Sequence, residues 1–511
     1  MDAVKSAFAG SHSLETTVRN WGNREAMYTS WPDSSKFRKA LKLAACLVLV
    51  YTIFSIPIPW HRSIHHQQQQ NHIKPDSSFQ EIEITGFINT GPPINVSCES
   101  LRHNTTISVQ NSTHLTDDLE AIANCLSSHP MVVYREDRTS ISQTWSRMAG
   151  SSVWLPSHQV FLSITRIIFY DDGVISWPVI SFIRAQLYDE NFTELHQTLT
   201  WSNGQKFSFP QILDIPVDYE KGGKVFGPED ARITIEQGVK NAEPVIVFNM
   251  ISKESKWKRA MHTYRPFSKE VKMLKIRGRE PLEKEKNWAP FFHGDGSGEA
   301  SRHIMIVYMP SPLQILWCSL ENGECDVAYN QQGLEPGLLT EHVGEAHALK
   351  GGSNFVSVRP GVWIGLPRTH IDVKCGWNNP VYRPMFMVLV RAGDTYHVAY
   401  ASGAVDFGAA VLSEEQQKDP CHAGRILIPN SIARLDGNAL TITFSVDDRT
   451  NQAAKVIMDM DWQAVGALNV SERVNRAAVG NDVVKCGIES HINNTHAMAD
   501  VWYREHPDQT P

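Results

Sequence analysis

The sequence predicts an all-β body, because short runs of alternating apolar and polar residues recur along it with turn residues between them. Residues 82–88 are one such run. Four pairs of runs have the pattern of antiparallel hairpins: 160–169 with the apolar run after 171–173, 303–308 with 314–319, 385–391 with 396–401, and 431–435 with 440–446. Short strands at near-regular spacing are typical of a β-sandwich, a barrel or a propeller.

Helical patterns are scarce along the same stretch, and residues 115–126 are the best candidate for a helix before the main body. Strands and helices do not alternate, and no Gly-rich phosphate loop follows a predicted strand. The sequence therefore argues against a doubly wound parallel sheet. No exact internal repeat is visible, so the pattern by itself gives no number of blades.

The composition is that of an ordinary globular protein. The 511 residues are 42% hydrophobic and 20% charged, with a formal net charge of −7. A chain of this length buries a large core in one to four domains. The net negative charge gives no indication of nucleic-acid binding.

An uncharged segment near the N-terminus predicts a membrane anchor. Residues 1–42 are polar and end in a basic cluster, and residues 43–60 follow without a charge. This length is close to the lower limit for a transmembrane helix, and Trp60 suits an interfacial anchor. The basic flank should stay in the cytosol, which predicts a type II signal anchor. A cleaved signal peptide is the alternative, and it would need its apolar core nearer the start.

Residues 61–78 are polar and of low complexity, which predicts a stem, and the luminal body then covers 79–511 with a core at about 150–465. All the Asn-x-Ser/Thr sequons lie beyond the apolar segment, as a glycosylated luminal body requires. They begin at Asn95, Asn104, Asn111, Asn191, Asn469 and Asn493.

Seven of the eight cysteines also follow the apolar segment, where an oxidising lumen permits disulfides. Cys318 and Cys325 flank a Glu-Asn-Gly turn and are the predicted pair. Because seven is odd, one luminal thiol should stay free or bridge two chains. No Cys or His spacing is typical of a zinc site. No cofactor is firmly indicated, and a need for a divalent metal stays open.

The segment 227–233, Gly-Pro-Glu-Asp-Ala-Arg-Ile, places two carboxylates and a guanidinium between a turn and an apolar alternating run. A turn can aim Glu229, Asp230 and Arg232 into a cleft, and the strand that follows holds the backbone still. A carboxylate beside a fixed arginine suits general acid/base chemistry. The alternative is a surface turn with an ordinary ion pair.

Residues 253–286 hold twelve Lys or Arg against five Glu. Such a run is either a solvated face or a clamp for a departing phosphate. Arg265 lies within it, and Lys286 precedes an aromatic, Pro-bearing run that would hold it rigid. Arg383, in a Tyr-Arg-Pro segment, and Asp406, after 400–405, stand at predicted strand ends, where β-scaffolds present sites.

Together these segments resemble the fungal β-mannosyltransferases that elaborate cell-wall mannans, over about residues 150–465. The anchor and stem suit such a Golgi membrane enzyme. More distantly, segment 227–233 resembles the Glu-Asp-Pro/Ala-Arg signature of the β-mannoside phosphorylases. Lys286-Asn287 resembles their Lys-Asn, and 400–406 resembles their Tyr-Gly-Ala-Ala-Asp. Those phosphorylases are five-bladed β-propellers, so the resemblance implies a five-bladed propeller-like domain.

The resemblance implies that Asp230 is the general acid/base and that Lys286 binds phosphate. It also implies that Asp406 holds hydroxyls of the reacting mannose, although segment 402–405 is longer here than in the phosphorylases. Glu229 and Arg232 are, like Asp406, candidates for binding the sugar. Arg265 and Arg383 have no clear counterpart and stay candidates for binding the donor phosphates.

The function that this resemblance implies is an inverting transfer of mannose from GDP-mannose to a mannan or mannooligosaccharide, with a β-1,2 linkage. Microscopic reversibility relates it to a phosphorylase, since the carboxylate that protonates a leaving oxygen also deprotonates an attacking hydroxyl. Two alternatives remain: a β-mannoside phosphorylase or hydrolase on the same scaffold, and a non-catalytic mannan-binding cell-wall protein.

Overall fold

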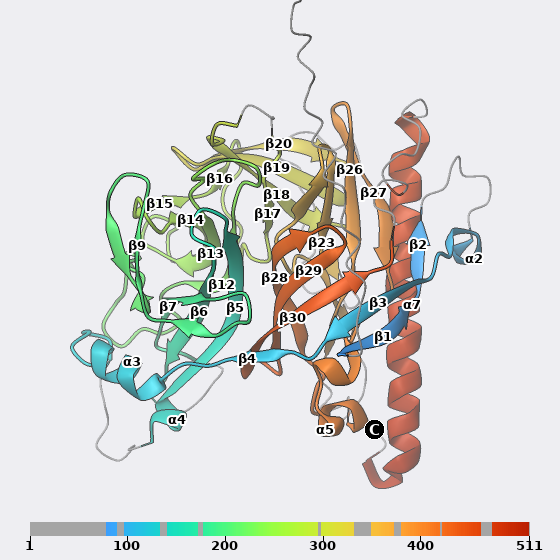
Figure 1. The fold of residues 1–511 in the computed structure, drawn as a ribbon, viewed down its shortest axis with the longest axis horizontal. Helices are drawn as coiled ribbons and strands as arrows, with labels where there is room; N and C mark the ends of the chain where they lie inside the picture. The colour runs from blue at the N-terminus through green and yellow to red at the C-terminus, as the bar shows by residue number, and fades with distance from the viewer. Residues whose placement is uncertain are drawn as a thin grey trace, which may run out of the picture. The chain divides into compact units, whose positions relative to one another are not determined.

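The computed structural model describes residues 78–88, 97–132, 140–171, 177–294, 298–331, 349–371, 380–419, 422–460, 465 and 473–509 (Figure 1). All of them belong to one compact unit, Gln70–Pro511. The predicted tail, the predicted anchor at 43–60 and the predicted stem up to residue 77 lie outside the described residues. Within the described ranges, no helix is long and apolar enough to cross a membrane.

The described residues are mostly β-strand, which confirms the predicted all-β class. Five of their sheets contain four or more strands, and we number these sheets I to V along the chain. Sheet I has the order β11-β7-β6-β5, with β8 beside β7. Its strands are β5 (Trp145–Leu155), β6 (Val160–Phe169), β7 (Ile180–Tyr188), β8 (Glu194–Leu195) and β11 (Gln211–Ile212).

Sheets II and III follow directly along the chain. Sheet II runs β12 (Glu229–Thr234), β13 (Val245–Ile251), β14 (Arg259–Arg265), β15 (Glu270–Met273). Sheet III has the order β16-β20-β19-β18-β17. Its strands are β16 (Lys275–Ile276), β17 (Ala289–Phe291), β18 (His303–Pro310), β19 (Leu313–Ser319) and β20 (Glu324–Asn330).

Sheets IV and V combine strands from both ends of the described chain. Sheet IV has the order β2-β27-β26-β23-β22, and sheet V has the order β1-β3-β30-β29-β28, with β4 beside β30. The strands of sheet IV are β2 (Gly86–Ile88), β22 (Val356–Arg359), β23 (Val362–Gly365), β26 (Met387–Ala392) and β27 (Thr395–Ser402). Those of sheet V are β1 (Phe79–Ile84), β3 (Thr105–Gln110), β4 (Thr113–Leu115), β28 (Leu427–Asp436), β29 (Ala439–Val446) and β30 (Thr450–Met458).

The remaining elements are short, with one exception. Two small sheets pair β9 (Thr198–Thr200) with β10 (Lys206–Ser208), and join β21 (Leu349–Lys350), β24 (Arg368–Ile371) and β25 (Val381–Pro384). The helices are α2 (Cys98–Leu101), α3 (Leu119–Leu126), α4 (Ile141–Thr144), α5 (Glu414–Lys418), α7 (Arg473–Glu505), η1 (Gly408–Ala410) and η2 (Pro507–Gln509).

The four predicted hairpins are confirmed. Antiparallel pairing joins β6 to β7, β18 to β19, β26 to β27 and β28 to β29, at the places where the sequence predicts strand pairs. The predicted helix at 115–126 contains α3, whose N-terminus is capped by the Asp118 side chain.

Neighbouring sheets bury their apolar faces against each other in sequence order. One core cluster joins sheets I and II through Leu162 and Phe248, and another joins II and III through Val247 and Ile306. Others join III and IV through Phe291 and Trp363, and sheets IV and V. Trp154, Phe161 and Tyr188 of sheet I then meet residues of sheet V. The packing therefore returns from the last sheet to the first.

One edge strand of each sheet also packs beside an edge strand of another sheet. β28 packs beside β5, β5 beside β12, β12 beside β17, and β22 beside β28. Sheet V is completed by the N-terminal strand β3, which pairs antiparallel with the C-terminal strand β30, for example Ile107 with Met458. The first and last strands of the described body are thus held in one sheet.

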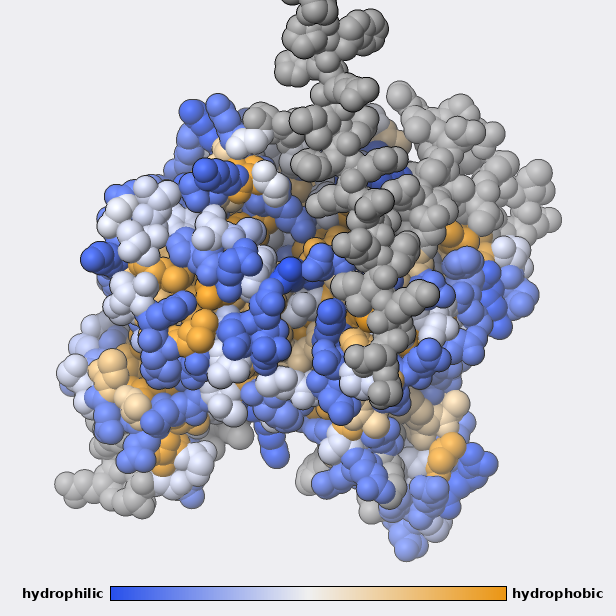
Figure 2. Space-filling view, viewed as in Figure 1, coloured by the Kyte–Doolittle hydropathy of each residue, from blue (hydrophilic) through white to orange (hydrophobic). Residues whose placement is uncertain are grey.

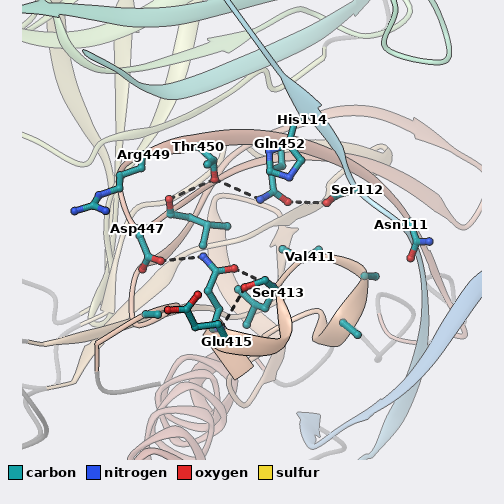
Figure 3. Close-up of a pocket in the computed structure, with 16 residues that line it drawn as sticks. Asn111, Ser112, His114, Val411, Ser413, Glu415, Asp447, Arg449, Thr450 and Gln452 are labelled. Atoms are coloured by element: carbon teal, nitrogen blue, oxygen red, sulfur yellow. Dashed lines mark hydrogen bonds between the residues drawn. The ribbon is translucent and has the colours of Figure 1, made fainter. Parts of the chain in front are cut away.

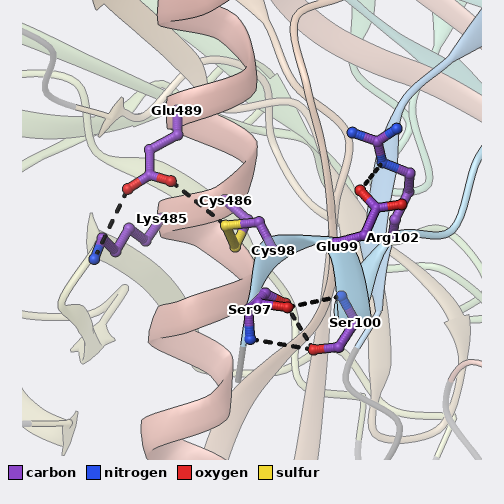
Figure 4. The surroundings of a disulfide bond; sticks show 8 residues. All are labelled: Ser97, Cys98, Glu99, Ser100, Arg102, Lys485, Cys486 and Glu489. Carbon is purple, nitrogen blue, oxygen red and sulfur yellow. Dashed lines mark hydrogen bonds and ion pairs between the residues drawn. A yellow bond between two sulfur atoms is a disulfide. The ribbon is translucent and has the colours of Figure 1, made fainter. Parts of the chain in front are cut away.

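The 33-residue helix α7 is the largest feature that the sequence analysis missed. It packs against β27 and β2 of sheet IV, where its residues Val483 and Val484 enter the core. The disulfide Cys98–Cys486 fastens it to α2 (Figure 4). The predicted disulfide Cys318–Cys325 is confirmed. Cys125 is free and exposed, while Cys46, Cys375 and Cys421 lie outside the described residues.

The surface shown in Figure 2 is hydrophilic over much of its described area, with smaller apolar areas between. The sequon residues within the described ranges, Asn104, Asn111, Asn191 and Asn493, are all exposed. Glycosylation of these residues stays a prediction that their exposure permits. Asn95 and Asn469 lie outside the described residues.

Candidate active site

The segment 227–233 enters sheet II through a β-bulge. Gly227 has a φ of 83°, and a Cβ at this position would lie 2.1 Å from the carbonyl oxygen of Ser181, so only glycine fits. The register of β12 against β13 then shifts between Glu229 and Arg232. Asp230 occupies this bulge with a left-handed φ of 51°. The bulge takes the Asp230 side chain out of the regular strand alternation, as bulges beside functional sites do.

Glu229 is held by two arginines from other strands. Its Oε1 accepts a hydrogen bond from Nη2 of Arg166 at 2.9 Å, and its Oε2 accepts one from Nε of Arg259 at 2.9 Å. Arg166 also donates from Nε to the Ser181 hydroxyl at 2.9 Å. Glu229 and Arg166 are both buried. This network ties sheet I to sheet II at the start of the bulge and engages both carboxylate oxygens of Glu229.

Arg232 is anchored to the backbone. Its Nε donates to the Gly352 carbonyl at 2.6 Å and its Nη1 to the Ala231 carbonyl at 2.9 Å. Burial, opposed by the nearby Asp230, lowers the pKa of Arg232 to about 10. The group therefore keeps its positive charge at neutral pH beside Asp230.

Asp230 differs from its neighbours because, among the described residues, its carboxylate has no hydrogen bond and no ion pair. The side chain is partly exposed. Burial by itself would raise the pKa of Asp230, but the positive charges of Arg166, Arg232, Arg368 and Lys286 outweigh it and lower the pKa. Asp230 is therefore an ionised carboxylate at neutral pH with its lone pairs available.

Lys286 and Arg368 bring cations from two further segments. Arg368, the first residue of β24, donates from Nη2 to Oδ1 of Asn287 at 2.8 Å and stacks over the Tyr382 ring at 5.5 Å. Lys286 reaches solvent and has no hydrogen-bond partner within the described ranges. The loss of solvent around its ammonium group lowers the pKa of Lys286, and the negative charge of Asp230 opposes this shift. These two cations are the most available of the cluster.

A second carboxylate, Asp448, approaches from the turn between β29 and β30. It has a left-handed φ of 53°. Burial raises the pKa of Asp448 and the negative charge of Asp230 raises it further, against the attraction of Arg368 and Arg166. The cluster around Asp230 thus joins groups from sheets I, II and V, from β24 and from the segment before β17.

Three predicted site residues are not among the charged groups that act on Asp230. Arg265 is paired with Glu243 and Glu270, at the opposite end of β14 from Arg259, about 20 Å along the strand. Arg383 is buried and donates to the carbonyls of Tyr382 and Arg425.

Asp406 is exposed and accepts a hydrogen bond from the Gly408 amide at 2.9 Å. Of the seven predicted catalytic and substrate-binding residues, the cluster contains Glu229, Asp230, Arg232 and Lys286. The roles in catalysis and substrate binding that the sequence predicts for all seven residues stay predictions.

Arg166, Arg368 and Asp448 belong to the cluster but were not among the predicted site residues. A usable signal existed for Arg166, because it is the lone charge within the otherwise apolar run 160–169. A charge in a buried strand needs a partner and so indicates a polar network. Asp448 gave no such signal, since Asp-Asp-Arg after a strand is also ordinary turn composition. Across the described ranges, no group of three or more His, Cys, Asp or Glu side chains is arranged to hold a metal ion.

Comparison with known proteins places this geometry in context. A family model described as beta-mannosyltransferases matches residues 97–263 and 257–493. The chain is 28% identical over 438 residues to Beta-mannosyltransferase 3 of Komagataella phaffii, covering 79% of this chain and 71% of that protein. It is 30% identical over 439 residues to Beta-mannosyltransferase 3 of Candida albicans, covering 77% of this chain and 75% of that protein.

One solved structure is 8% identical to this chain. Its description says that the GH130 family of mannoside phosphorylases contains glycoside hydrolases that target beta-1,2 mannosidic linkages in Candida mannan. The structure aligns with a TM-score of 0.39, over 75% of this chain and 96% of that one.

Proposed function

Because this chain belongs to the β-mannosyltransferase family of glycosyltransferases, we propose that it transfers mannose from GDP-mannose to a mannan or mannooligosaccharide with inversion at the anomeric carbon. Asp230 is the general base in this proposal, and the linkage formed is β-1,2. The observation that carries the proposal is the Asp230 carboxylate, ionised by four surrounding cations and without a hydrogen-bond partner in the described part of the chain.

The reaction needs a group that accepts a proton from the attacking hydroxyl. The acceptor oxygen forms a bond to C1 of the mannose on the face opposite the phosphate, and the C1–phosphate bond breaks with its electron pair leaving on GDP. The hydroxyl proton passes to Asp230, directly or through a sugar hydroxyl. An ionised carboxylate with free lone pairs suits this step, whereas Glu229, whose oxygens are both engaged, does not.

The reaction also needs positive charge where the diphosphate departs. Lys286 and Arg368 suit this role, since Lys286 has no partner among the described residues and Arg368 keeps donors beyond its single bond to Asn287. Arg166 already donates to Glu229, and Arg232 already donates to backbone carbonyls. These two arginines therefore contribute long-range electrostatic attraction to the diphosphate more than direct hydrogen bonds. A phosphorylase running in the synthetic direction would use the same cations for inorganic phosphate.

We also propose that sheets I to V are the five blades of a β-propeller. Two observations support this: the edge strands β5, β12, β17, β22 and β28, one from each sheet, pack beside edge strands of other sheets, and the packing returns from sheet V to sheet I. The pairing of β3 with β30 would then close the ring. An experimental structure with the five sheets in two stacked layers would refute it.

We propose that the protein is located in the Golgi membrane as a type II protein, with residues 43–60 as its anchor and with its body in the lumen. The two disulfides Cys98–Cys486 and Cys318–Cys325 support an oxidising compartment. Mapping of glycan occupancy at the exposed sequons tests it, and protease protection in intact vesicles gives the orientation. Unglycosylated protein that is digested from the cytosolic side would refute the orientation.

The activity is tested with the full chain, purified in detergent and incubated with GDP-mannose and an α-mannooligosaccharide, with NMR of the product. We expect a β-linked mannose. Asp230→Asn should lower kcat at least about a hundredfold while the fold is kept. The matched control is Asp394→Asn, which changes a fully exposed carboxylate and should leave the rate unchanged.

Three results would contradict the proposal. Near-normal turnover by the Asp230→Asn protein would exclude this residue as the base. Cleavage of β-mannosides that requires added phosphate, without any use of GDP-mannose, would identify a phosphorylase instead. Binding of mannan by folded protein without either reaction would point to a binding protein.

A further inference from the structure

A pocket of about 660 Å³ opens beside the β29–β30 turn, and none of the residues assigned to catalysis above lines it (Figure 3). Its walls come from residues 111–114 before and within β4, from residues 409–416 spanning η1 and α5, and from residues 446–452. The volume is that of a typical small-ligand site. Nothing in the proposed chemistry at Asp230 uses this pocket.

One wall of the pocket is fixed by its own hydrogen bonds. The Ser112 hydroxyl donates to Gln452 Oε1 at 2.6 Å, and Gln452 Nε2 donates to the Thr450 hydroxyl at 3.3 Å. On another side, Asp447 accepts from Gln416 Nε2 at 3.0 Å and from the Gly424 amide at 2.9 Å. A pocket with walls held in this way is largely formed before a ligand arrives.

Other polar side chains of the pocket are exposed and unengaged. Asn111, His114, Glu415 and Arg449 line it, and within the described ranges none of these four side chains has a hydrogen bond or an ion pair. Because Asn111 is also a predicted glycosylation site, the groups that stay available to a ligand are the imidazole, the carboxylate and the guanidinium, which supply both donors and acceptors. With Asp447, the lining holds two acidic residues and one arginine, which gives no preference for an anion.

The rest of the lining is apolar and buried, and includes Val411, Leu412 and Val446. A sugar presents hydroxyl groups at its rim and C–H groups on its ring faces, so it matches a pocket with polar edges and an apolar floor. The pocket suits a nucleotide or a phosphate less well, because the carboxylates of Asp447 and Glu415 outnumber the guanidinium of Arg449.

The pocket also adjoins the proposed catalytic centre through one turn. Asp447 lines the pocket, and the negative charge of Asp230 raises the pKa of the next residue, Asp448. Both have left-handed φ values, 55° and 53°, and the bonds of Asp447 to Gln416 and Gly424 hold this unusual backbone.

We propose that this pocket is an acceptor subsite that binds mannose units remote from the hydroxyl that reacts. The proposal rests on the transferase function proposed above and adds the site that selects long acceptors. Arg449 is the residue on which recognition depends most, because a charged donor makes the strongest hydrogen bonds to sugar hydroxyls.

Binding is measured by titration calorimetry with the full-length Asp230→Asn protein, so that turnover does not interfere. Every protein also carries Asn111→Gln, which keeps an amide at the pocket but removes the sequon whose glycan would stand there. We expect Arg449→Ala to raise the Kd for mannotetraose about tenfold and to leave the Kd for mannobiose nearly unchanged. Arg302→Ala, at an exposed arginine outside the pocket, is the matched control and should change neither.

In proteins that retain Asp230, Arg449→Ala should raise KM for mannotetraose by a similar factor, with kcat on mannobiose unchanged. Equal Kd values for mannotetraose with and without Arg449→Ala would overturn the subsite, even if mannose transfer is observed. Loss of affinity for both acceptors to the same degree would also overturn it. Arg449-dependent binding in a protein that never uses GDP-mannose would support the pocket and refute the transferase function.

Discussion

The guanidinium of Arg166 lies 2.9 Å from the carboxylate of Glu229, so that a strand of sheet I holds the residue next to Asp230 in sheet II. Both side chains are more than nine-tenths buried. Glu229 and Asp230 are adjacent acidic residues with different tasks: the first is fully bonded, and the second is left open toward four cations. The position of the proposed base is thus set by an ion pair between sheets.

Glu229→Gln tests this positioning. The amide keeps the shape but leaves Arg166 and Arg259 without their shared negative partner, and the loss of one member of a buried ion pair costs about 3–5 kcal/mol. We expect a free energy of unfolding lower by this amount in urea titration, together with reduced kcat. The control Glu190→Gln breaks a pair with Arg434 on the surface and should cost under about 1 kcal/mol. Equal effects of the two changes would contradict the positioning role.

Gly227→Ala tests the geometry of the bulge. A Cβ would lie 2.1 Å from the Ser181 carbonyl oxygen at a residue with φ of 83°. Gly238 has a similar φ of 78° but open space around it, so Gly238→Ala measures the left-handed strain alone, about 1–2 kcal/mol. We expect Gly227→Ala to lower the melting temperature clearly more than Gly238→Ala does. Similar melting temperatures would show that the close approach is relaxed at little cost.

Asp448→Asn tests the second carboxylate through pH. Since the pKa of Asp448 is raised in the folded chain, the folded state binds its proton more readily than the unfolded state does. Ionised Asp448 therefore weakens stability at neutral pH, and this penalty disappears as the pH falls through the raised pKa toward the ordinary value of about 4. We expect Asp448→Asn to be more stable than the unmodified protein at pH 7, with the difference shrinking in acid. Chemical denaturation at several pH values measures it, and a difference that grows in acid would contradict the assignment.

The two disulfides should differ in their contribution to stability. Cys98 and Cys486 are 388 residues apart, whereas Cys318 and Cys325 are 7 apart. In the chain-entropy account, the longer loop restricts the unfolded chain more, by about 3–4 kcal/mol. Replacing the first pair with serine should therefore lower the free energy of unfolding more than replacing the second. The opposite order would show that native packing of α7, and not loop closure, determines the effect.

Much of the architecture could be predicted from local pattern. The hairpins at 160–169, 303–319, 385–401 and 431–446 are visible because side chains alternate between two faces of a strand with a period of two. The Cys318–Cys325 pair was equally local, since a tight turn brings its own flanks together. Helix α7 was not predicted because its sequence has little apolar periodicity.

The sequence by itself determined the all-β class, the motif that contains Asp230 and the β-mannosyltransferase resemblance, because each of these is carried by residues close together in the chain. Only the tertiary structure decided which distant charges surround Asp230. Arg166, Lys286, Arg368 and Asp448 come from four separate segments, whereas Arg265 lies apart although it is nearer to Asp230 in sequence than Lys286 is. Electrostatic interaction depends on distance in space, and a fold of many hairpins places residues from distant segments side by side.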